Sequence, residues 1–484
     1  MSFISSHTLL SLIASIASAL GILIAPLWWC TPLGLALFIF ILWEQTHTTA
    51  QSILYGCIFG FCTAGAGLLS LWEISPPENT ALSTTLAIGF LWLIPTLALG
   101  ALSVVFAYIV FTSRKNLFAP CIALCAFILH EYARMWAWML VTYGKGASTE
   151  PHLSITALGY ALADNSYLLQ VAAFGGLFAL TVLLAVLAIA LACIPRSTYS
   201  QTARIQTASA LFVVGIVLIL PLLHAEPKKQ VSGTRMVAVF STNVSATSTV
   251  FNSEALIKKI VSAPAPDIIL LPEGKTLETV FSQSEQKTFL PSWFETGDVL
   301  TIRSTESLEN NTTRYNTIVY ESSRTGLLAK QHKIFLMPEG EYVPYLSKPF
   351  LSWFKDSKIK SIPEQKTITH GNALVAVPFA GAVFGTLLCS EVFSPFLYHQ
   401  LATNHGATVL VNLADPQWFQ GSHLLFNKTV QIAKVHAVQN RSYFIAAQNS
   451  APSFVINPQG QLLAQTAWGE TDILFFSLPI ETSP

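Results

Sequence analysis

Charged residues are scarce in this sequence. They make up 11% of its 484 residues, whereas hydrophobic residues make up 52%, and soluble globular domains carry roughly 25% charged residues. Part of the chain is therefore predicted to lie in a lipid bilayer. Most charged side chains fall in the second half of the sequence. We predict a transmembrane domain over residues 1–225 and a soluble domain over residues 226–484.

The sequence also lacks an excess of charge of either sign. Lys and Arg together number 26, as do Asp and Glu, and no dense basic run occurs. Nucleic-acid binding requires a basic surface, so we expect no nucleic-acid partner. Cysteine is sparse as well, because Cys389 is the single thiol of residues 226–484. No disulfide can form within that region, and a lone buried Cys is most often inert.

Long apolar runs, in contrast, are abundant before residue 225. A membrane-spanning helix needs about 20 mainly apolar residues, and seven stretches come near this length. They are residues 8–24, 26–43, 52–72, 84–111, 118–140, 168–194 and 206–224. We predict a multi-pass bundle of about seven helices. The first stretch lacks a basic N-terminal region, so we expect a retained helix rather than a cleaved signal peptide.

Basic residues flank two of these stretches. Arg114 and Lys115 follow the fourth stretch, and Arg196 and Arg204 lie between the sixth and seventh. The positive-inside rule places both loops in the cytoplasm. Seven crossings then put residues 226–484 on the opposite face. We therefore predict a protein of the bacterial inner membrane whose soluble domain lies in the periplasm.

Two charged residues interrupt the fifth apolar stretch. Glu131 and Arg134 lie in the segment HEYARMWAW, and charges inside a membrane are rare and often functional. A second interpretation is that they lie three residues apart on one helical face and simply pair with each other. The two interpretations are compatible, and the sequence leaves both open.

Residues 226–484 alternate between strand and helix patterns. Strands are predicted at residues 236–241, 267–271, 316–321, 374–378, 383–388 and 408–412. Helical patterns at residues 253–262 and 422–440 alternate with them. Such interleaving predicts an α/β layered domain in which helices cover a sheet, and the region is long enough for one core of its own.

Three segments of this domain hold reactive side chains near strand ends. Glu273 lies in LLPEG, Lys333 and Glu341 lie in KIFLMPEGEYVP, and Cys389 and Glu391 lie in GTLLCSEVF. Each residue alone is weak evidence, because a Glu after a strand is usually solvated and a single Lys usually lies on the surface. A thiol with a carboxylate and a lysine is, however, a set suited to covalent acyl transfer.

These motifs resemble the apolipoprotein N-acyltransferases, a membrane-embedded family of the nitrilase superfamily. That family has a Pro-Glu after an early strand, a K-x-x-L-x-P-x-G-E-[YF]-V-P run and a later Cys-x-Glu. This sequence supplies Pro272–Glu273, Lys333–Pro344 and Cys389–Glu391. The first half resembles the family through Glu131, Arg134, residues 159–164, Gln170 and Gly175–Gly176. The resemblance implies a nitrilase-like αββα sandwich beside the transmembrane bundle.

Three features depart from the family pattern. Its Asn-Asp-x-Trp-Phe appears here as residues 415–419, Asp-Pro-Gln-Trp-Phe, and its Arg-Ala-x-Glu appears as residues 436–439, His-Ala-Val-Gln. The family usually ends in a further transmembrane helix, whereas no apolar span follows Leu474–Leu478. We therefore expect the soluble domain to be tethered at one end.

The resemblance implies a role for each site residue. Cys389 would be the nucleophile, Glu273 the base, and Lys333, with the Cys389 backbone N–H, the group that stabilises the oxyanion. The remaining candidates would orient Lys333 or substrate. They are Glu341, Glu391, Tyr342 and Trp418.

The same resemblance implies the substrates. A phospholipid would donate an acyl chain to Cys389, and the α-amine of a diacylglyceryl-cysteine lipoprotein would accept it. The partners are thus the lipid bilayer and these two lipids, with no cofactor or metal, and we expect a monomer. An alternative is a membrane-tethered nitrilase-type amidase that acts on another amide or amine substrate. Two more distant alternatives are a non-catalytic lipid-binding protein and a transporter.

Overall fold

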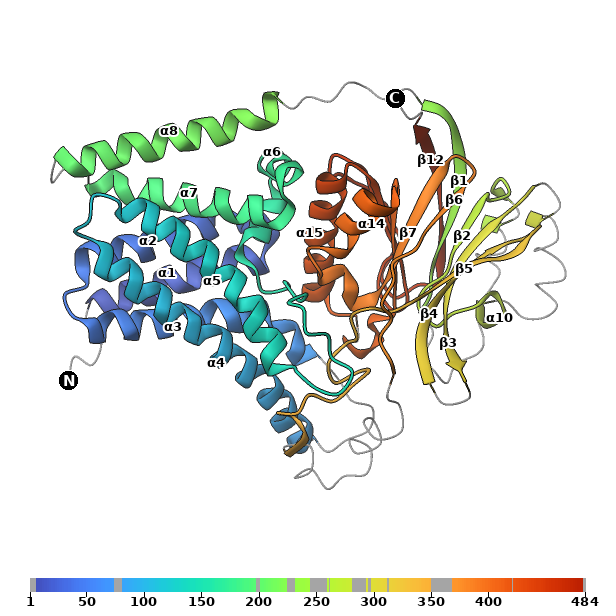
Figure 1. Ribbon diagram of the computed structural model, residues 1–484, viewed down its shortest axis with the longest axis horizontal. Helices are drawn as coiled ribbons and strands as arrows, with labels where there is room; N and C mark the ends of the chain where they lie inside the picture. The colour runs from blue at the N-terminus through green and yellow to red at the C-terminus, as the bar shows by residue number, and fades with distance from the viewer. Residues whose placement is uncertain are drawn as a thin grey trace.

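A helical bundle and an α/β domain lie next to each other along the long axis of the computed structural model (Figure 1). The structure describes residues 6–73, 81–196, 201–223, 231–243, 259–260, 262–280, 293–294, 297–310, 313–349, 368–419 and 421–481. The predicted fold class, a multi-pass bundle joined to an α/β domain, is confirmed by this arrangement.

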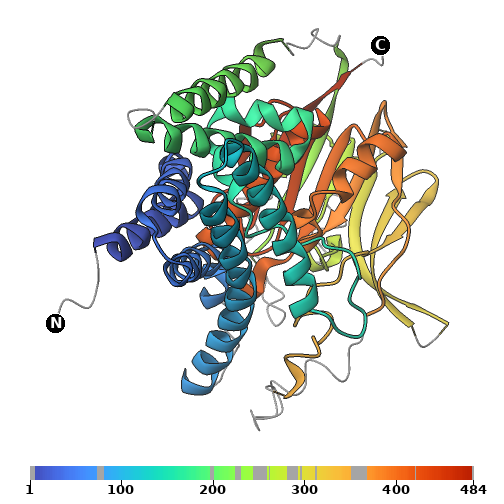
Figure 2. The same cartoon turned by 60° about the vertical axis from the view of Figure 1, so that its left-hand side comes forward.

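The bundle has a helix at each of the seven predicted positions. These helices are α1 (Ser6–Leu23), α2 (Cys30–Phe40), α3 (Thr49–Gly67), α4 (Ala81–Ser113), α5 (Ala119–Val141), α7 (Gly176–Arg196) and α8 (Gln201–Leu223). Figure 2 shows that α4, with 33 residues, projects beyond its neighbours. In the described part of the chain, 4 helices, α1, α4, α7 and α8, are long and apolar enough to cross a membrane. The chain is thus a membrane protein, and seven crossings stay a prediction.

The sixth helix begins later than the sequence predicts. Residues 168–175 belong instead to short helical turns and their connections. These turns are α6 (Ser166–Leu169) and η5 (Gln170–Phe174), and another turn, η4 (Leu158–Asp164), precedes them. Gly176 starts α7 with a φ of 58°, a conformation that glycine adopts without steric cost. A Cβ there would lie 2.2 Å from Oε1 of Gln439, so glycine also permits close contact with the α/β domain.

The α/β domain consists of two six-stranded sheets. The first has the order β12-β1-β2-β3-β4-β5 and the second β11-β10-β9-β8-β7-β6. The first contains β1 (Val231–Ser241), β2 (Ile268–Leu270), β3 (Leu300–Glu309), β4 (Thr313–Ser322), β5 (Gly326–His332) and β12 (Asp472–Glu481). The second contains β6 (Ala376–Phe379), β7 (Ala382–Leu388), β8 (Val409–Ala414), β9 (Tyr443–Gln448), β10 (Phe454–Ile456) and β11 (Leu462–Gln465).

The sheets pack face to face through an apolar layer, in which Val239, Ile302, Phe384 and Val411 are buried. Helices α14 (Leu397–His405) and α15 (His423–Asn440) cover the outer face of the second sheet, and α10 (Leu277–Val280) lies against the first (Figure 1). This order of layers is an αββα sandwich. The helix predicted at residues 253–262 lies largely outside the described residues.

Helix α15 lies between the second sheet and the bundle (Figure 1). A single buried apolar cluster runs from the bundle, through Leu177 and Leu184, to Ile432 and Val438 of α15 and Phe444 of β9. The two halves of the molecule therefore share one hydrophobic core. This contact places the end of the bundle beside the C-terminal ends of β7 and β8.

Candidate active site

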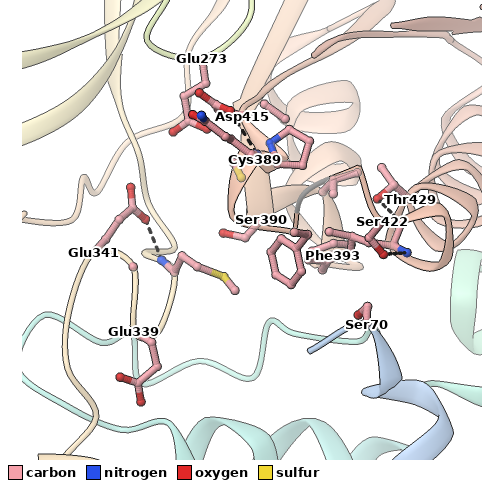
Figure 3. A pocket seen from close by; sticks show the side chains of 18 of the residues that line it. Ser70, Glu273, Glu339, Glu341, Cys389, Ser390, Phe393, Asp415, Ser422 and Thr429 are labelled. Atoms are coloured by element: carbon pink, nitrogen blue, oxygen red, sulfur yellow. Dashed lines mark hydrogen bonds between the residues drawn. The ribbon is translucent and has the colours of Figure 1, made fainter. Parts of the chain in front are cut away.

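Cys389 occupies a sharp turn at the end of β7. It begins a 3-10 turn, η6 (Cys389–Phe393), and its φ is 44°. Left-handed backbone is unfavourable for a residue with a side chain, and such strain is often found at active sites. The thiol lines a cavity between the two halves of the molecule, and Figure 3 shows it there beside Ser390 and Asp415.

Glu273 and Lys333 reach the same cavity from the first sheet. Glu273 lies three residues beyond β2, and Lys333 directly follows β5. The Nζ atom of Lys333 lies 2.8 Å from Oε2 of Glu341 and 3.9 Å from Oε1 of Glu273. The structure thus brings Cys389, Glu273, Lys333 and Glu341 together at one site, although more than 100 residues separate Glu273 from Cys389.

Asn316, on β4, is a site residue that sequence reasoning missed. Its side-chain Nδ2 donates to Oε1 of Glu273 at 2.6 Å and to Oε1 of Glu341 at 3.2 Å. Its backbone oxygen accepts from the backbone N–H of Lys333 at 2.8 Å. Asn316 therefore links both carboxylates and the lysine. The one signal in the sequence that could have pointed to Asn316 is its polar side chain at the start of a predicted strand.

Burial and neighbouring charges set the protonation of the site. Burial raises the pKa of Glu273. Burial opposes the charged form of Lys333, but the carboxylates of Glu341 and Glu273 outweigh it and raise the lysine pKa. Burial raises the pKa of the Cys389 thiol, and the charge of Glu273 raises it further. These directions favour a neutral thiol and an ammonium, so a thiol that acts as a nucleophile here requires a base.

Glu391 is buried behind the cavity rather than in its lining. Its Oε2 accepts from the N–H of Leu388 at 2.7 Å, and its Oε1 accepts from the N–H groups of Ile334 and Phe335 at 2.7 Å and 3.1 Å. Burial raises its pKa to about 7. Glu391 thus links the chain that follows Lys333 to the end of β7, directly before Cys389.

The other predicted orienting residues lie in different places. Glu341 contacts Lys333 and also accepts from the N–H of Met337 at 2.7 Å. Tyr342 is buried, and its hydroxyl donates to the backbone oxygen of Thr142 in the first half of the chain at 2.9 Å. The side chain of Trp418 lies outside the described part of the structure.

Glu131 and Arg134 pair with each other inside the bundle. Arg134 Nη1 lies 2.9 Å from Oε1 of Glu131, and Oε2 of Glu131 accepts from the N–H of Leu158 at 2.8 Å. Both side chains are buried, and neither lines the cavity. The geometry fits the interpretation that Glu131 and Arg134 form a structural pair. Through Leu158, this pair connects α5 to η4.

Two segments that depart from the family pattern lie near the turn that carries Cys389. Asp415 lines the cavity, where its carboxylate lies 3.5 Å from Nζ of Lys275 and accepts from Nδ2 of Asn449 at 2.8 Å. His436 is buried, and its Nε2 lies 2.8 Å from the backbone oxygen of Val392. Both residues therefore support the turn that carries Cys389 or the wall beside it.

The cavity is large and mainly apolar away from the charged residues. Its volume is about 670 Å³, within the range of ligand-binding pockets. Both halves of the chain line it. The apolar lining residues include Leu68, Ile88, Trp138, Leu153, Ile155, Val392, Phe393, Phe419, Leu425 and Phe426. Figure 3 shows Ser70 of the bundle facing the wall formed by Phe393 and Ser422.

Comparison with known proteins places this site in context. The carbon-nitrogen hydrolase family matches residues 294–483, a region that contains Lys333, Glu341 and Cys389. An amidase from Nesterenkonia sp. has a solved structure that is 15% identical, with a TM-score of 0.37, over 53% of this chain and 94% of that one.

Curated relatives extend the similarity into the bundle. An apolipoprotein N-acyltransferase of Aquifex aeolicus is 27% identical over 222 residues, covering 46% of this chain and 47% of that relative. Another, of Nitrosomonas europaea, is 24% identical over 451 residues, covering 88% of this chain and 82% of the relative. The chain spans less than half the length of the Aquifex aeolicus and Agrobacterium fabrum relatives that it matches. Residues 294–483 are thus similar to the carbon-nitrogen hydrolase family, and the similarity to the Nitrosomonas europaea apolipoprotein N-acyltransferase also includes the bundle.

Proposed function

We propose that this protein is an apolipoprotein N-acyltransferase that moves an acyl chain from a phospholipid to the N-terminal α-amine of a diacylglyceryl-cysteine lipoprotein. One observation carries the proposal. Cys389, Glu273 and Lys333 meet in a cavity whose apolar walls come from both the bundle and the α/β domain. A site built for small soluble amides has no need of a wall that continues into membrane helices.

The first half-reaction forms a thioester. Glu273 takes the thiol proton as Sγ of Cys389 attacks the ester carbonyl of the phospholipid. The Lys333 ammonium and the backbone N–H of Cys389 stabilise the oxyanion. When the intermediate collapses, the ester C–O bond breaks and Glu273 returns the proton to the departing oxygen. The products are acyl-Cys389 and a lysophospholipid.

The second half-reaction forms an amide. The neutral α-amine of the lipoprotein attacks the thioester carbonyl, and the same two donors stabilise the oxyanion. Glu273 accepts a proton from the attacking nitrogen. The C–S bond then breaks, and Glu273 returns the proton to the Cys389 sulfur, which restores the free thiol.

A bilayer location follows from the substrates. Burying an acyl chain is worth about 0.8 kcal/mol per CH₂, so a 16-carbon chain resists leaving lipid by roughly 12 kcal/mol. Leu68, Ile88 and Leu153 extend the cavity wall into the bundle. An acyl chain entering between these residues stays in apolar surroundings as its ester reaches Cys389.

The orientation is also a proposal: an inner-membrane protein with the α/β domain in the periplasm. The C-terminal ends of α4 and α7 lie together, since Nη2 of Arg196 donates to the backbone oxygen of Arg114 at 3.2 Å. Figure 1 places the C-terminal end of α7 and the start of α8 at the end of the bundle away from the α/β domain. With the basic loops in the cytoplasm, the α/β domain faces the other side.

Intact mass measurement tests the proposed function. Incubation with phospholipid vesicles should add one acyl chain to the protein, removable by hydroxylamine and absent in Cys389→Ala. A synthetic diacylglyceryl-cysteine peptide should then remove the adduct and gain an amide-linked acyl chain. Release of free fatty acid at the same rate with and without the peptide would contradict the proposal and favour a hydrolase.

A further inference from the structure

The segment that follows α5 contacts both catalytic parts of the α/β domain. We call residues 142–157 the α5–η4 segment. Two of its residues, Leu153 and Ile155, line the cavity. The remaining contacts reach the loop that carries Glu341 and the turn that carries Cys389, so a segment of the first half of the chain bridges the two.

Its first contact is with the loop that holds Lys333 in place. Gly144 forms an antiparallel β-bridge with Pro344, and the backbone oxygen of Tyr143 accepts from the N–H of Tyr345 at 2.8 Å. A Cβ at residue 144 would lie 2.5 Å from the backbone oxygen of Val343, so the approach requires glycine. This bridge begins three residues after Glu341, the carboxylate nearest to the Lys333 ammonium.

Its second contact is with the nucleophile turn. The backbone N–H and the Oγ of Ser154 both donate to the backbone oxygen of Phe393, at 3.1 Å and 2.7 Å. Ser154 is 1% exposed, and its hydroxyl also lies 2.7 Å from that of Tyr160. Phe393 is the last residue of η6 and lines the cavity.

The turn depends on such contacts because its backbone is strained at Cys389. A φ of 44° persists where the surroundings hold it. Nδ2 of Asn412 donates to the backbone oxygen of Cys389 at 3.3 Å, and His436 contacts that of Val392. These two residues belong to the α/β domain. Ser154 adds the restraint on Phe393 from the first half of the chain.

We propose that the α5–η4 segment positions the active site: Ser154 fixes the Cys389 turn, and the bridge at Gly144 fixes the loop of Glu341 against it. The inference rests on the proposed thiol chemistry of Cys389 but not on the identity of the acyl acceptor. Ser154 is a positioning residue that acts through Phe393. The bundle thus contributes to catalysis by geometry as well as by binding lipid.

Acylation by a soluble ester tests this role apart from lipid binding. The full chain in detergent, treated with p-nitrophenyl butyrate, should release a burst of p-nitrophenol as Cys389 is acylated. In Ser154→Ala we expect the acylation rate constant to fall about 10-fold with KM within about 2-fold, because small displacements of reacting groups strongly reduce rate. Ser154→Thr, which keeps the hydroxyl, should recover most of the rate.

Ser148→Ala is the matched control, because Ser148 lies in the same segment and its hydroxyl accepts from the N–H of the nearby Glu150. Equal acylation rates in Ser154→Ala and Ser148→Ala would overturn the proposal. If Ser154→Ala lowers the thermal midpoint, Gly144→Ala decides the question: a slower burst supports positioning, and a wild-type burst rejects it. If the wild-type protein gives a burst with the soluble ester but transfers no acyl chain from phospholipid, that result would reject the proposed function alone.

Discussion

Two clusters of buried charge, one in the α/β domain and one in the bundle, have similar contacts and different surroundings. Lys333 lies 2.8 Å from Glu341, and Arg134 lies 2.9 Å from Glu131. The first cluster opens on a cavity with a thiol in its wall, whereas the second is closed by protein on all sides that the structure describes. Burial and pairing therefore do not by themselves identify a candidate catalytic site, and the feature that distinguishes the first cluster is an open cavity with a thiol in its wall.

The largest effect should follow from removing the nucleophile. Cys389→Ser keeps the volume of the side chain but replaces the thiol with a much less acidic hydroxyl. We expect acyl transfer to fall by at least about 10³-fold, with the free energy of unfolding within about 1 kcal/mol of wild type. Thioester mass and denaturant unfolding measure the two quantities. Transfer at a near-wild-type rate would show that Cys389 is not the nucleophile, and the two clusters would then not differ in function.

The next effect should come from the base. Glu273→Gln retains an oxygen that accepts from Asn316, but an amide cannot take the thiol proton. We expect acylation of Cys389 to slow by about 10²- to 10⁴-fold. Burst kinetics with a chromogenic ester measure this rate. A normal burst would place the base on another residue.

A smaller effect should follow from Asn316→Ala, with a change in pH dependence. The hydrogen bond from Asn316 lowers the pKa of Glu273, so its loss should raise that pKa. Acylation requires the Glu273 carboxylate, so the rise of rate with pH should move to higher pH, with a loss of about 10-fold near neutrality. A pH–rate profile that keeps its position would limit Asn316 to a structural role.

The smallest effect on chemistry should come from the bundle cluster. Glu131→Gln leaves the buried Arg134 charge without its partner, which typically costs about 3–5 kcal/mol of stability. We expect a lower thermal midpoint but an acylation rate per folded molecule within about 3-fold of wild type. Comparison of active-site titration with burst rate separates the two quantities. A large loss of rate in folded protein would show that the bundle cluster takes part in catalysis.

Several features could be predicted from the sequence because their signals are local. Apolar runs located the seven helices, and the motifs around Glu273, Lys333 and Cys389 named the residues that the structure brings together. The helix after Gly175 was placed too early, because residues 168–174 are mainly apolar and the sequence does not show the positive φ of Gly176, where the folded chain brings Gln439 close.

The missed residues act across long separations. Asn316 meets Glu273 across 43 residues, and Ser154 meets Phe393 across 239. Neither residue belongs to a motif, and both look like ordinary polar residues in the sequence. Glu391 was predicted to orient Lys333 and shape the pocket, and the sequence did not show its partners, which are backbone N–H groups that the folded chain brings near. Such roles arise from tertiary contacts rather than from periodicity or spacing.

The position of α15 has a consequence for folding and synthesis. One side of this helix packs on the second sheet and another on the bundle, so separating the halves would expose apolar surface on both. The bundle precedes the α/β domain in the sequence, so it enters the membrane first and forms the surface on which α15 later docks. Mutations in α7 that disturb this shared apolar surface should therefore weaken the packing of α15 and, through it, the sandwich.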